Sequence, residues 1–295
     1  MNKLYIQRRI GRGHVEVIND SAAISITDLF WIKRPHLNFT WDSLQSNRDI
    51  SEVVNKATLD GVLNAEAWKN PKTDYTSNFI TKGTFRKSIY KNYLIKKGDN
   101  AEYEISGYNI AKHLGISCAR AISVGEEVHC ELFTSEEISM AHALEILYDF
   151  DTETYSDIYS RAIDFVKDKP IIANNLKKLY LLMYLCSNFD FHGENFGFLY
   201  NTSDFEIIGV APAFDFNSAF ECWNDTTIYY EEIMELLPEI INNNLDLVAP
   251  LKSIDTVLEE DIHLSKEAKN EVTSRAIYLV GLVNNVTTTC YFRKQ

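Results

Sequence analysis

The chain has 295 residues, 45% hydrophobic and 24% charged, so it can bury one large core or two lobes and is not disordered throughout. A net charge of −13 argues against a general nucleic-acid-binding surface. There is no run of 18 apolar residues, no apolar N-terminal signal core and no C-x-x-C pair among the five cysteines. These features predict a cytoplasmic protein with buried free thiols and exclude a membrane span and a disulfide or zinc framework.

The first 78 residues carry weak patterns. Residues 14–33 alternate loosely between apolar and polar residues and predict short strands. Residues 49–64 have helical periodicity behind a candidate cap, and residues 70–78 are polar with a proline, which is typical of a loop.

Residues 79–97 are predicted to form two strands, F-I-T-K-G-T-F and K-S-I-Y-K-N-Y-L-I-K, with Gly83 at the bend. A helix follows over residues 102–114 and stops at Gly115, because glycine tolerates the left-handed backbone of a helix C-terminus. Residues 119–133 alternate again and predict strands.

Helical patterns dominate the second half, in residues 135–148, 154–166, 174–187, 228–243 and 265–284. A hairpin interrupts them, because two apolar segments flank the turn N-T-S-D, and Ser265 is a candidate cap for the last helix. Strands followed by helices predict a two-lobed α+β fold with a cleft between lobes of residues 1–134 and 135–295.

Six lysines and arginines lie between Tyr75 and Gly98 with no acid among them. A local basic stretch in an acidic protein favours a site for an anionic ligand. A solvated strand face explains the same pattern about equally well, so the charge alone does not decide.

The most informative segment is C-S-N-F-D-F-H-G-E-N-F-G-F-L at residues 186–199. A polar loop with Asp190, His192 and Asn195 lies between an apolar helix and an apolar strand. We interpret Asp190 as the group that orients an attacking hydroxyl, and Asn195 as a magnesium ligand. His192 is expected to brace the loop through a backbone or carboxylate contact, and Asn188 either fastens the loop or forms a turn.

Asp215 follows 25 residues after Asp190, at the end of the hairpin, in A-P-A-F-D-F-N. A carboxylate that emerges from a buried strand needs a partner, and a second magnesium ligand fits that need. The alternative is an N-cap for the next segment. Two carboxylates and an amide in this order suit phosphoryl transfer.

Lys96 ends the strand N-Y-L-I-K, and Glu104 lies in the first turn of the next helix. A strand lysine held by a helix glutamate is the device that kinases use on the α- and β-phosphates. Lys97 and Glu102 are the rivals. Alternation does not choose between the lysines, because both strand faces carry apolar residues, and Lys96 is preferred because Lys97 abuts Gly98.

Two weaker segments complete the candidate nucleotide site. Lys82 and Gly83 lie at the bend T-K-G-T-F-R-K-S, where backbone N–H groups and a cation suit phosphates. Glu131 and Phe133 lie in C-E-L-F-T-S-E, where the chain passes from strands to helices, and this connector is a candidate contact for an adenine edge. A plain connector is an equal interpretation.

These segments resemble a known family. N-F-D-F-H-G-E-N-F-G-F-L followed by A-P-A-F-D-F resembles the catalytic loop and metal motif of the HipA-like serine/threonine kinases, the toxin kinases of bacterial persistence modules. The order D-x-H-x-x-N is also similar to that of phosphoinositide-3-kinase-type enzymes. Y-L-I-K, E-I-S-G-Y-N-I-A-K-H-L-G-I and C-E-L-F-T-S-E-E-I-S look like the family's lysine motif, helix and hinge. The resemblance covers about residues 79–220.

The resemblance implies a two-lobed kinase-like fold, with nucleotide-binding strands and a helix at residues 79–133, and ATP- and Mg²⁺-dependent phosphorylation of a protein. It also implies autophosphorylation in the loop around Thr81, Thr84 and Ser88, a toxin role and an antitoxin-like protein partner. Residues 1–75 match the family's N-terminal subdomain poorly, which puts that partner in doubt, and Asp215 is followed by Phe-Asn rather than Phe-Gly.

Two other functions are compatible with the motifs. The chain is either a pseudokinase that docks a nucleotide or a regulator without turnover, or a kinase for a small molecule or lipid. The intact set of Asp190, Asn195, Asp215 and Lys96 speaks against the first, and the lack of a clear lipid-binding helix speaks against the second.

Overall fold

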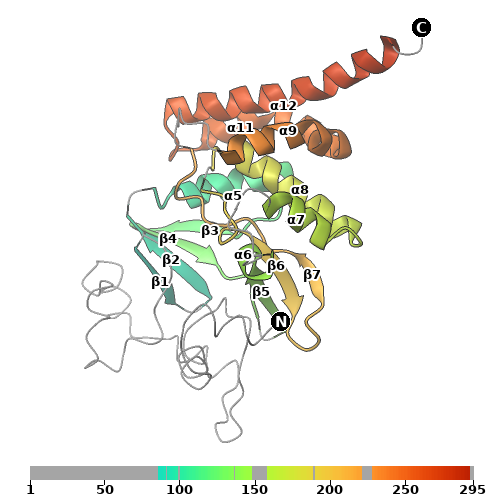
Figure 1. The fold of residues 1–295 in the computed structure, drawn as a ribbon. Helices are drawn as coiled ribbons and strands as arrows, with labels where there is room; N and C mark the ends of the chain where they lie inside the picture. The colour runs from blue at the N-terminus through green and yellow to red at the C-terminus, as the bar shows by residue number, and fades with distance from the viewer. Residues whose placement is uncertain are drawn as a thin grey trace, which may run out of the picture.

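The computed structural model describes residues 86–90, 92–98, 100–135, 137–147, 158–188, 190–220 and 228–292. The strands predicted over residues 14–33, the helix over 49–64, the loop over 70–78 and the bend with Thr81, Lys82, Gly83 and Thr84 lie outside these residues. The prediction that Ser88 lies in a loop was wrong, because its backbone pairs with Ile95 between two strands of a sheet; of this residue, only the backbone is described. Within the described parts, the protein combines two antiparallel sheets with several helices (Figure 1).

The first sheet has four antiparallel strands in the order β1-β2-β4-β3. They are β1 (Arg86–Tyr90), β2 (Tyr93–Lys97), β3 (Ala121–Val124) and β4 (Glu127–Glu131). The prediction of one strand over K-S-I-Y-K-N-Y-L-I-K was wrong, because Tyr90 pairs with Tyr93 and the segment folds back as a hairpin. The polar pair Lys-Asn between the two strands fits strand alternation as well as it fits a turn, so the sequence pattern did not reveal the hairpin turn.

Helix α5 (Tyr103–Leu114) packs on this sheet and ends as predicted at Gly115, which has a φ of +69°. Its first turn contributes Ile105 to a small core with Val128 and Cys130 of β4. The same turn carries Glu104, so packing of this helix also determines where that carboxylate lies.

The second sheet has three antiparallel strands in the order β5-β6-β7, namely β5 (Ile138–His142), β6 (Gly197–Asn201) and β7 (Ile207–Val210). The predicted hairpin is therefore confirmed. The single helix predicted over residues 135–148 was wrong, because β5 precedes a short helix, α6 (Ala143–Leu147). Pairing of Met140 with Leu199 of β6 overrides the local helical pattern.

The remaining helices come from the second half of the chain and form the helical part of the molecule. The predicted ones are present as α7 (Ile158–Phe165), α8 (Pro170–Leu185), α9 (Ile228–Asn243) and α12 (Lys266–Phe292), and the predicted Ser265 cap accepts a hydrogen bond from the Ala268 N–H. Short elements η3 (Leu245–Leu247), α10 (Val248–Lys252) and α11 (Ile254–Glu260) were not predicted, because two turns or fewer give too little periodicity.

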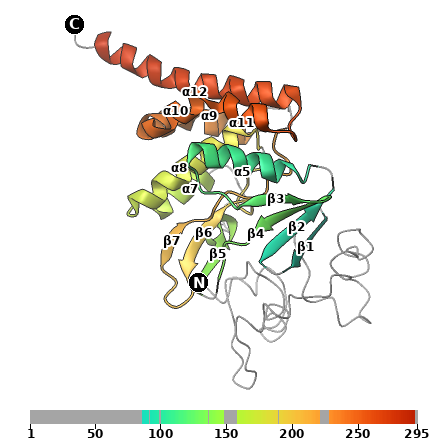
Figure 2. The same cartoon turned by 180° about the vertical axis from the view of Figure 1, so that it is seen from behind.

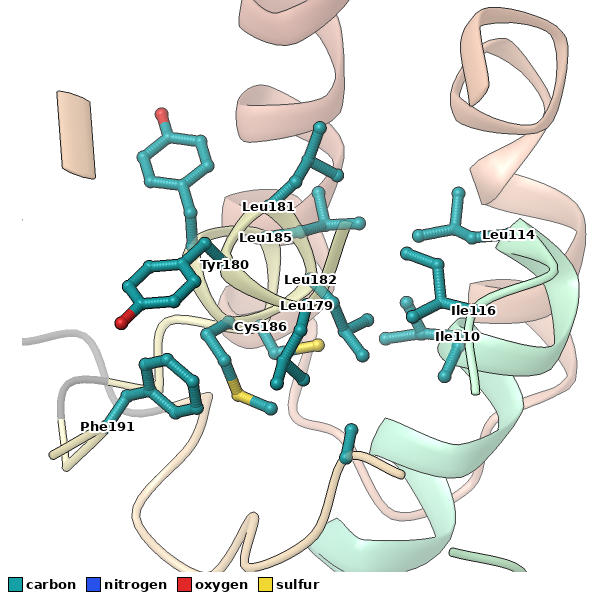
Figure 3. Close-up of a cluster of buried hydrophobic side chains, with 14 of the residues drawn as sticks. Ile110, Leu114, Ile116, Leu179, Tyr180, Leu181, Leu182, Leu185, Cys186 and Phe191 are labelled. Atoms are coloured by element: carbon teal, nitrogen blue, oxygen red, sulfur yellow. The ribbon is translucent and has the colours of Figure 1, made fainter. Parts of the chain in front are cut away.

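Helix α8 lies at the centre of the main core. Almost every residue of its second half is buried, from Leu179 to Leu185. Figure 3 shows the side chains of Ile110, Leu114 and Ile116, at and after the end of α5, pointing towards α8. The loop with Asp190 begins at the C-terminus of α8. Because α8 is packed on many sides, the first residues of this loop are fixed in position.

The layers follow one another from the sheets to the outer helices. Both views place α5 and α8 between the sheets and the group α9, α11 and α12 (Figures 1 and 2). The two halves of the α+β fold are thus a strand-rich part and a helical part, although β5 comes from a segment predicted to be helical and joins the predicted hairpin of β6 and β7 in the second sheet. The lobe boundary at residue 134 stays a prediction.

The described residues bear on two predictions made from composition, namely the lack of a membrane span and the state of the cysteines. No helix in the described ranges is long and apolar enough to cross a membrane. The cysteines that the structure describes, Cys118, Cys130 and Cys186, are free thiols as predicted, and the last two are buried.

Candidate active site

Lys96 joins three segments that lie far apart in the sequence. Its Nζ atom lies 2.5 Å from Oε1 of Glu104 on α5 and 2.8 Å from Oδ1 of Asp215, which follows β7. Lys96 and Glu104 are 3% and 4% exposed, so this is a buried ion pair. The predicted contact between Lys96 and Glu104 is confirmed, while its role in holding phosphates stays a prediction.

Burial decides between the rival residues. Lys97 points to the other side of the strand and lies 3.4 Å from Glu126, whose side chain is 87% exposed. Glu102 is exposed and is the N-cap residue directly before α5. Since successive strand residues face opposite sides, only Lys96 reaches the interior beside α5.

The charges of this cluster depend on one another. Burial disfavours the charged form of Lys96, but Glu104 and Asp215 outweigh it, so the pKa of Lys96 is raised and the ammonium stays charged. Burial raises the pKa of Glu104, against the lowering effect of the Lys96 ammonium. Glu104 Oε1 also accepts a hydrogen bond of 2.9 Å from the Phe216 N–H. The carboxylate of Glu104 therefore holds both the lysine and the backbone next to Asp215.

Asp215 is held from several directions. Its φ is +65°, a left-handed conformation that aspartate tolerates better than most residues but that is uncommon outside turns and functional sites. Its carbonyl oxygen accepts a hydrogen bond of 3.0 Å from Asn188 Nδ2, and its Oδ1 accepts one of 2.7 Å from Asn217 Nδ2. Asn188 therefore fastens the loop, as predicted, and does so to the Asp215 segment. A part in catalysis for Asn188 stays a prediction.

The loop after α8 carries the proposed base. Asn195 donates a hydrogen bond of 2.5 Å from Nδ2 to the carbonyl oxygen of Asp190, which closes the loop between them. His192 Nε2 lies 3.6 Å from Asp190 Oδ1, and its Nδ1 accepts a hydrogen bond from the Glu194 N–H. Because Nδ1 is an acceptor, the proton of the neutral ring lies on Nε2, facing Asp190. His192 thus makes the predicted hydrogen bond to the backbone, whereas its distance of 3.6 Å from the Asp190 carboxylate is an ion-pair distance and too long for a hydrogen bond.

The electrostatics of Asp190 suit a base. Its side chain is 54% exposed, so a substrate hydroxyl can reach it. Partial burial raises the pKa of Asp190, His192 lowers it, and the negative charge of Asp215 raises it again. Asn195 and Ser218 lie near the carboxylate and also lower this pKa. The influence of Asp215 also shows that the two carboxylates are electrostatic neighbours.

The donor set fits magnesium when phosphate is counted with it. In the described ranges, no group of three or more His, Cys, Asp and Glu side chains is placed to hold a metal by itself. Magnesium in nucleotide sites typically takes one or two carboxylates and completes its shell with phosphate oxygens and water. Asp215 supplies a carboxylate, and Asn195 presents an amide oxygen, because its Nδ2 is already turned to Asp190.

The predicted hinge lies where β4 leaves the first sheet. The Glu131 N–H donates to the Arg120 carbonyl and the Leu132 N–H donates to the Asn92 carbonyl. These amides serve the sheet, so Phe133 is the better placed of the two predicted residues. Its ring lies 5.9 Å from that of Phe214, centroid to centroid, which puts an aromatic surface directly before Asp215. Binding of adenine by Glu131 and Phe133 stays a prediction.

Sequence reasoning missed three residues of this network. Asn217 donates a hydrogen bond to Asp215, and Ser218 lowers the pKa of Asp190. Gly107 of α5 lies against the ring of Phe216. The Phe-Asn pair after Asp215 was noticed only as a departure from Phe-Gly. A polar residue two positions after a proposed metal ligand was the available signal, because the ligands of a metal site are usually hydrogen-bonded themselves.

No family model matches the sequence, and no curated protein matches it. Among solved structures, the fold is similar to the Helicobacter pylori proinflammatory kinase CtkA, with 16% identity over 72% of this chain and 97% of that chain and a TM-score of 0.48.

The fold is also similar to HipA from Shewanella oneidensis, solved in a toxin–antitoxin complex with HipB and operator DNA. The identity is 13% over 94% of this chain and 80% of that chain, with a TM-score of 0.48. At these identities and TM-scores the likeness assigns no function, which depends on the residues of this chain.

Proposed function

We propose that the protein is an ATP- and Mg²⁺-dependent serine/threonine protein kinase of HipA-like type. The observation that supports this most is the position of Lys96 between Glu104 and Asp215, 2.5 Å and 2.8 Å from its two carboxylate partners. The buried lysine and the motif order of the Asp190 loop are independent features, since the lysine lies on β2 and the loop follows α8.

The residues have distinct roles in this proposal. Lys96 places its ammonium on the phosphates of ATP, and Glu104 keeps the lysine in place. Asn195 and Asp215 would hold Mg²⁺, which, when bound, neutralises charge on the phosphate oxygens. Asp190 accepts a hydrogen bond from the attacking hydroxyl and takes its proton on a carboxylate oxygen. The hydroxyl oxygen then bonds to the γ-phosphorus of ATP while the bond from that phosphorus to the β–γ bridging oxygen breaks, and ADP leaves. His192 and Asn195 keep the Asp190 loop closed.

Further parts of the proposal follow from the resemblance. A protein hydroxyl is the expected acceptor, and Thr81, Thr84 and Ser88 are the expected sites of autophosphorylation. The cytoplasmic location is proposed from the composition of the chain rather than from the resemblance. A toxin role and an antitoxin-like partner are proposed with them, because the HipA neighbour was solved with HipB. The basic residues Lys82 and Lys96 and the bend at Gly83 are assigned to the phosphates of ATP.

An assay with radiolabelled ATP and Mg²⁺ tests the proposal. The wild type is expected to label itself or a generic protein substrate, and Asp190→Asn and Asp215→Ala are expected to abolish labelling while keeping the fold. Asp164→Asn is the matched control, because it removes an exposed carboxylate that pairs only with an exposed lysine in the described structure. Undiminished labelling by either site variant would contradict the mechanism.

The same assay separates the alternatives. Nucleotide binding without any turnover by the wild type would identify a pseudokinase. Turnover that needs a small molecule or lipid, with no protein labelled, would identify the other class of kinase. Both outcomes overturn the proposal of a protein kinase.

A further inference from the structure

Asn217 is a buried amide beside the proposed metal ligand. It is 2% exposed, and its Nδ2 donates a hydrogen bond of 2.7 Å to Asp215 Oδ1. Its Oδ1 is buried and has no hydrogen-bond partner among the residues that the structure describes. A buried amide oxygen without a partner costs free energy. The hydrogen bond that Nδ2 donates to Asp215 is the contact that offsets this cost.

The same carboxylate oxygen has a second donor. Lys96 Nζ lies 2.8 Å from Asp215 Oδ1, so this oxygen accepts from both the lysine and Asn217. A carboxylate oxygen has two lone-pair positions, and two donors occupy both. A cation would therefore meet Asp215 at Oδ2, and the rotation of the carboxylate is determined by the two donors on Oδ1.

The backbone around Asp215 does not provide this control. Asn188 holds the Asp215 carbonyl oxygen and Glu104 holds the Phe216 N–H, but neither contact restrains rotation of the Asp215 side chain. Lys96 alone is a poor restraint, because its ammonium also serves Glu104 and, in the proposed function, the phosphates. Asn217, by contrast, gives its described side-chain hydrogen bond to the Asp215 carboxylate alone.

We infer that Asn217 is a positioning residue, which turns Asp215 so that Oδ2 faces the divalent cation of the nucleotide complex. This inference rests on the proposed kinase function and assigns to this chain a carboxylate orienter at the position where the resembled pattern has glycine. It predicts that loss of the donor weakens metal binding before it affects the fold.

The test measures binding of Mn²⁺, with a nonhydrolysable ATP analogue, by electron paramagnetic resonance on the full chain. Asn217→Ala and the isosteric Asn217→Asp are each expected to raise the Kd of Mn²⁺ about 10-fold or more. Asn217→Asp decides the atom involved, because it keeps the shape and an acceptor oxygen but removes the N–H donor.

Asn244→Ala is the matched control. Asn244 is 1% exposed, donates from Nδ2 to the Ile240 carbonyl and also has a buried Oδ1 without a described partner, but it lies beside η3, away from the site. Its loss is expected to lower the thermal midpoint without changing the Kd of Mn²⁺. An equal change in Kd in the Asn217 and Asn244 variants would reduce Asn217 to a structural role and overturn the inference.

Two further results keep this inference separate from the kinase proposal. A wild type that binds no Mn²⁺ with the analogue overturns both. A wild type that binds, an Asp215→Ala variant that does not, and an Asn217→Asp variant that binds as tightly as the wild type or more tightly would leave the kinase proposal standing and make Asn217 a ligand or a space filler.

Discussion

The ring of Phe216 lies against the backbone of Gly107. A Cβ atom at residue 107 would come within 2.5 Å of Cδ1 and Cγ of this ring, and Phe216 itself is fully buried. Gly107 lies on α5, one turn after Glu104, and Phe216 is the residue after Asp215. This single contact therefore connects the helix that holds Lys96 to the segment that carries the proposed metal ligand.

The first prediction concerns Gly107→Ala. Alanine is favoured over glycine in a helix by about 1 kcal/mol, whereas overpacking a buried site costs about 1–3 kcal/mol. Because the ring is enclosed, we expect the clash to dominate and the free energy of unfolding in urea to fall. The proposed kinase activity should fall further than stability, since the clash pushes α5, which carries Glu104, and the segment with Asp215 apart.

Gly281→Ala in α12 is the control for that prediction. A Cβ atom there meets nothing within 4 Å, so only helix propensity changes. We expect this variant to gain up to about 1 kcal/mol and to keep its activity. A gain of the same size in Gly107→Ala would show that the contact with Phe216 is not tight.

The second prediction compares two neighbouring lysines. Lys96→Met leaves the buried Glu104 and the partly buried Asp215 without their shared cation, and breaking a buried pair costs about 3–5 kcal/mol. Lys97→Met removes a pair with the exposed Glu126, which is worth about 0–1 kcal/mol. Urea unfolding of both variants checks the difference. Equal losses would contradict the burial of the Lys96 cluster.

The third prediction concerns pH. Asp190 must be deprotonated to act as a base, and its pKa is raised by burial and by Asp215 and lowered by His192. The acid limb of kcat/KM should therefore lie above the ordinary range of an aspartate. His192→Gln removes the lowering effect, so the acid limb should move to higher pH. If the acid limb stays at the same pH in this variant, His192 does not lower the pKa of the catalytic base.

The fourth prediction concerns autophosphorylation at Thr81, Thr84 and Ser88, of which Ser88 lies on β1. After incubation with ATP and Mg²⁺, mass spectrometry of the wild type should find phosphate on at least one of Thr81, Thr84 and Ser88. The Asp190→Asn protein, incubated in the same way, should carry none. Phosphate confined to other residues would refute the predicted autophosphorylation site without touching the catalytic mechanism.

Local patterns were sufficient for much of the secondary structure. The apolar periodicity of α5, α8, α9 and α12, and the turn between β6 and β7, are properties of short segments and were predicted from them. Strand β5 was not, because its buried Met140 and Ala141 depend on pairing with β6, more than 50 residues later.

For the site, residue types and spacing were enough to select Asp190, Asn195, Asp215, Lys96 and Glu104, since the chemistry of phosphoryl transfer limits the choice. The sequence by itself could not show that Lys96 reaches Asp215, 119 residues away, or that Asn217 shares the same oxygen. Burial and the packing of α5 against Phe216 decided these contacts. They depend on which surfaces meet in three dimensions, and no local pattern encodes that.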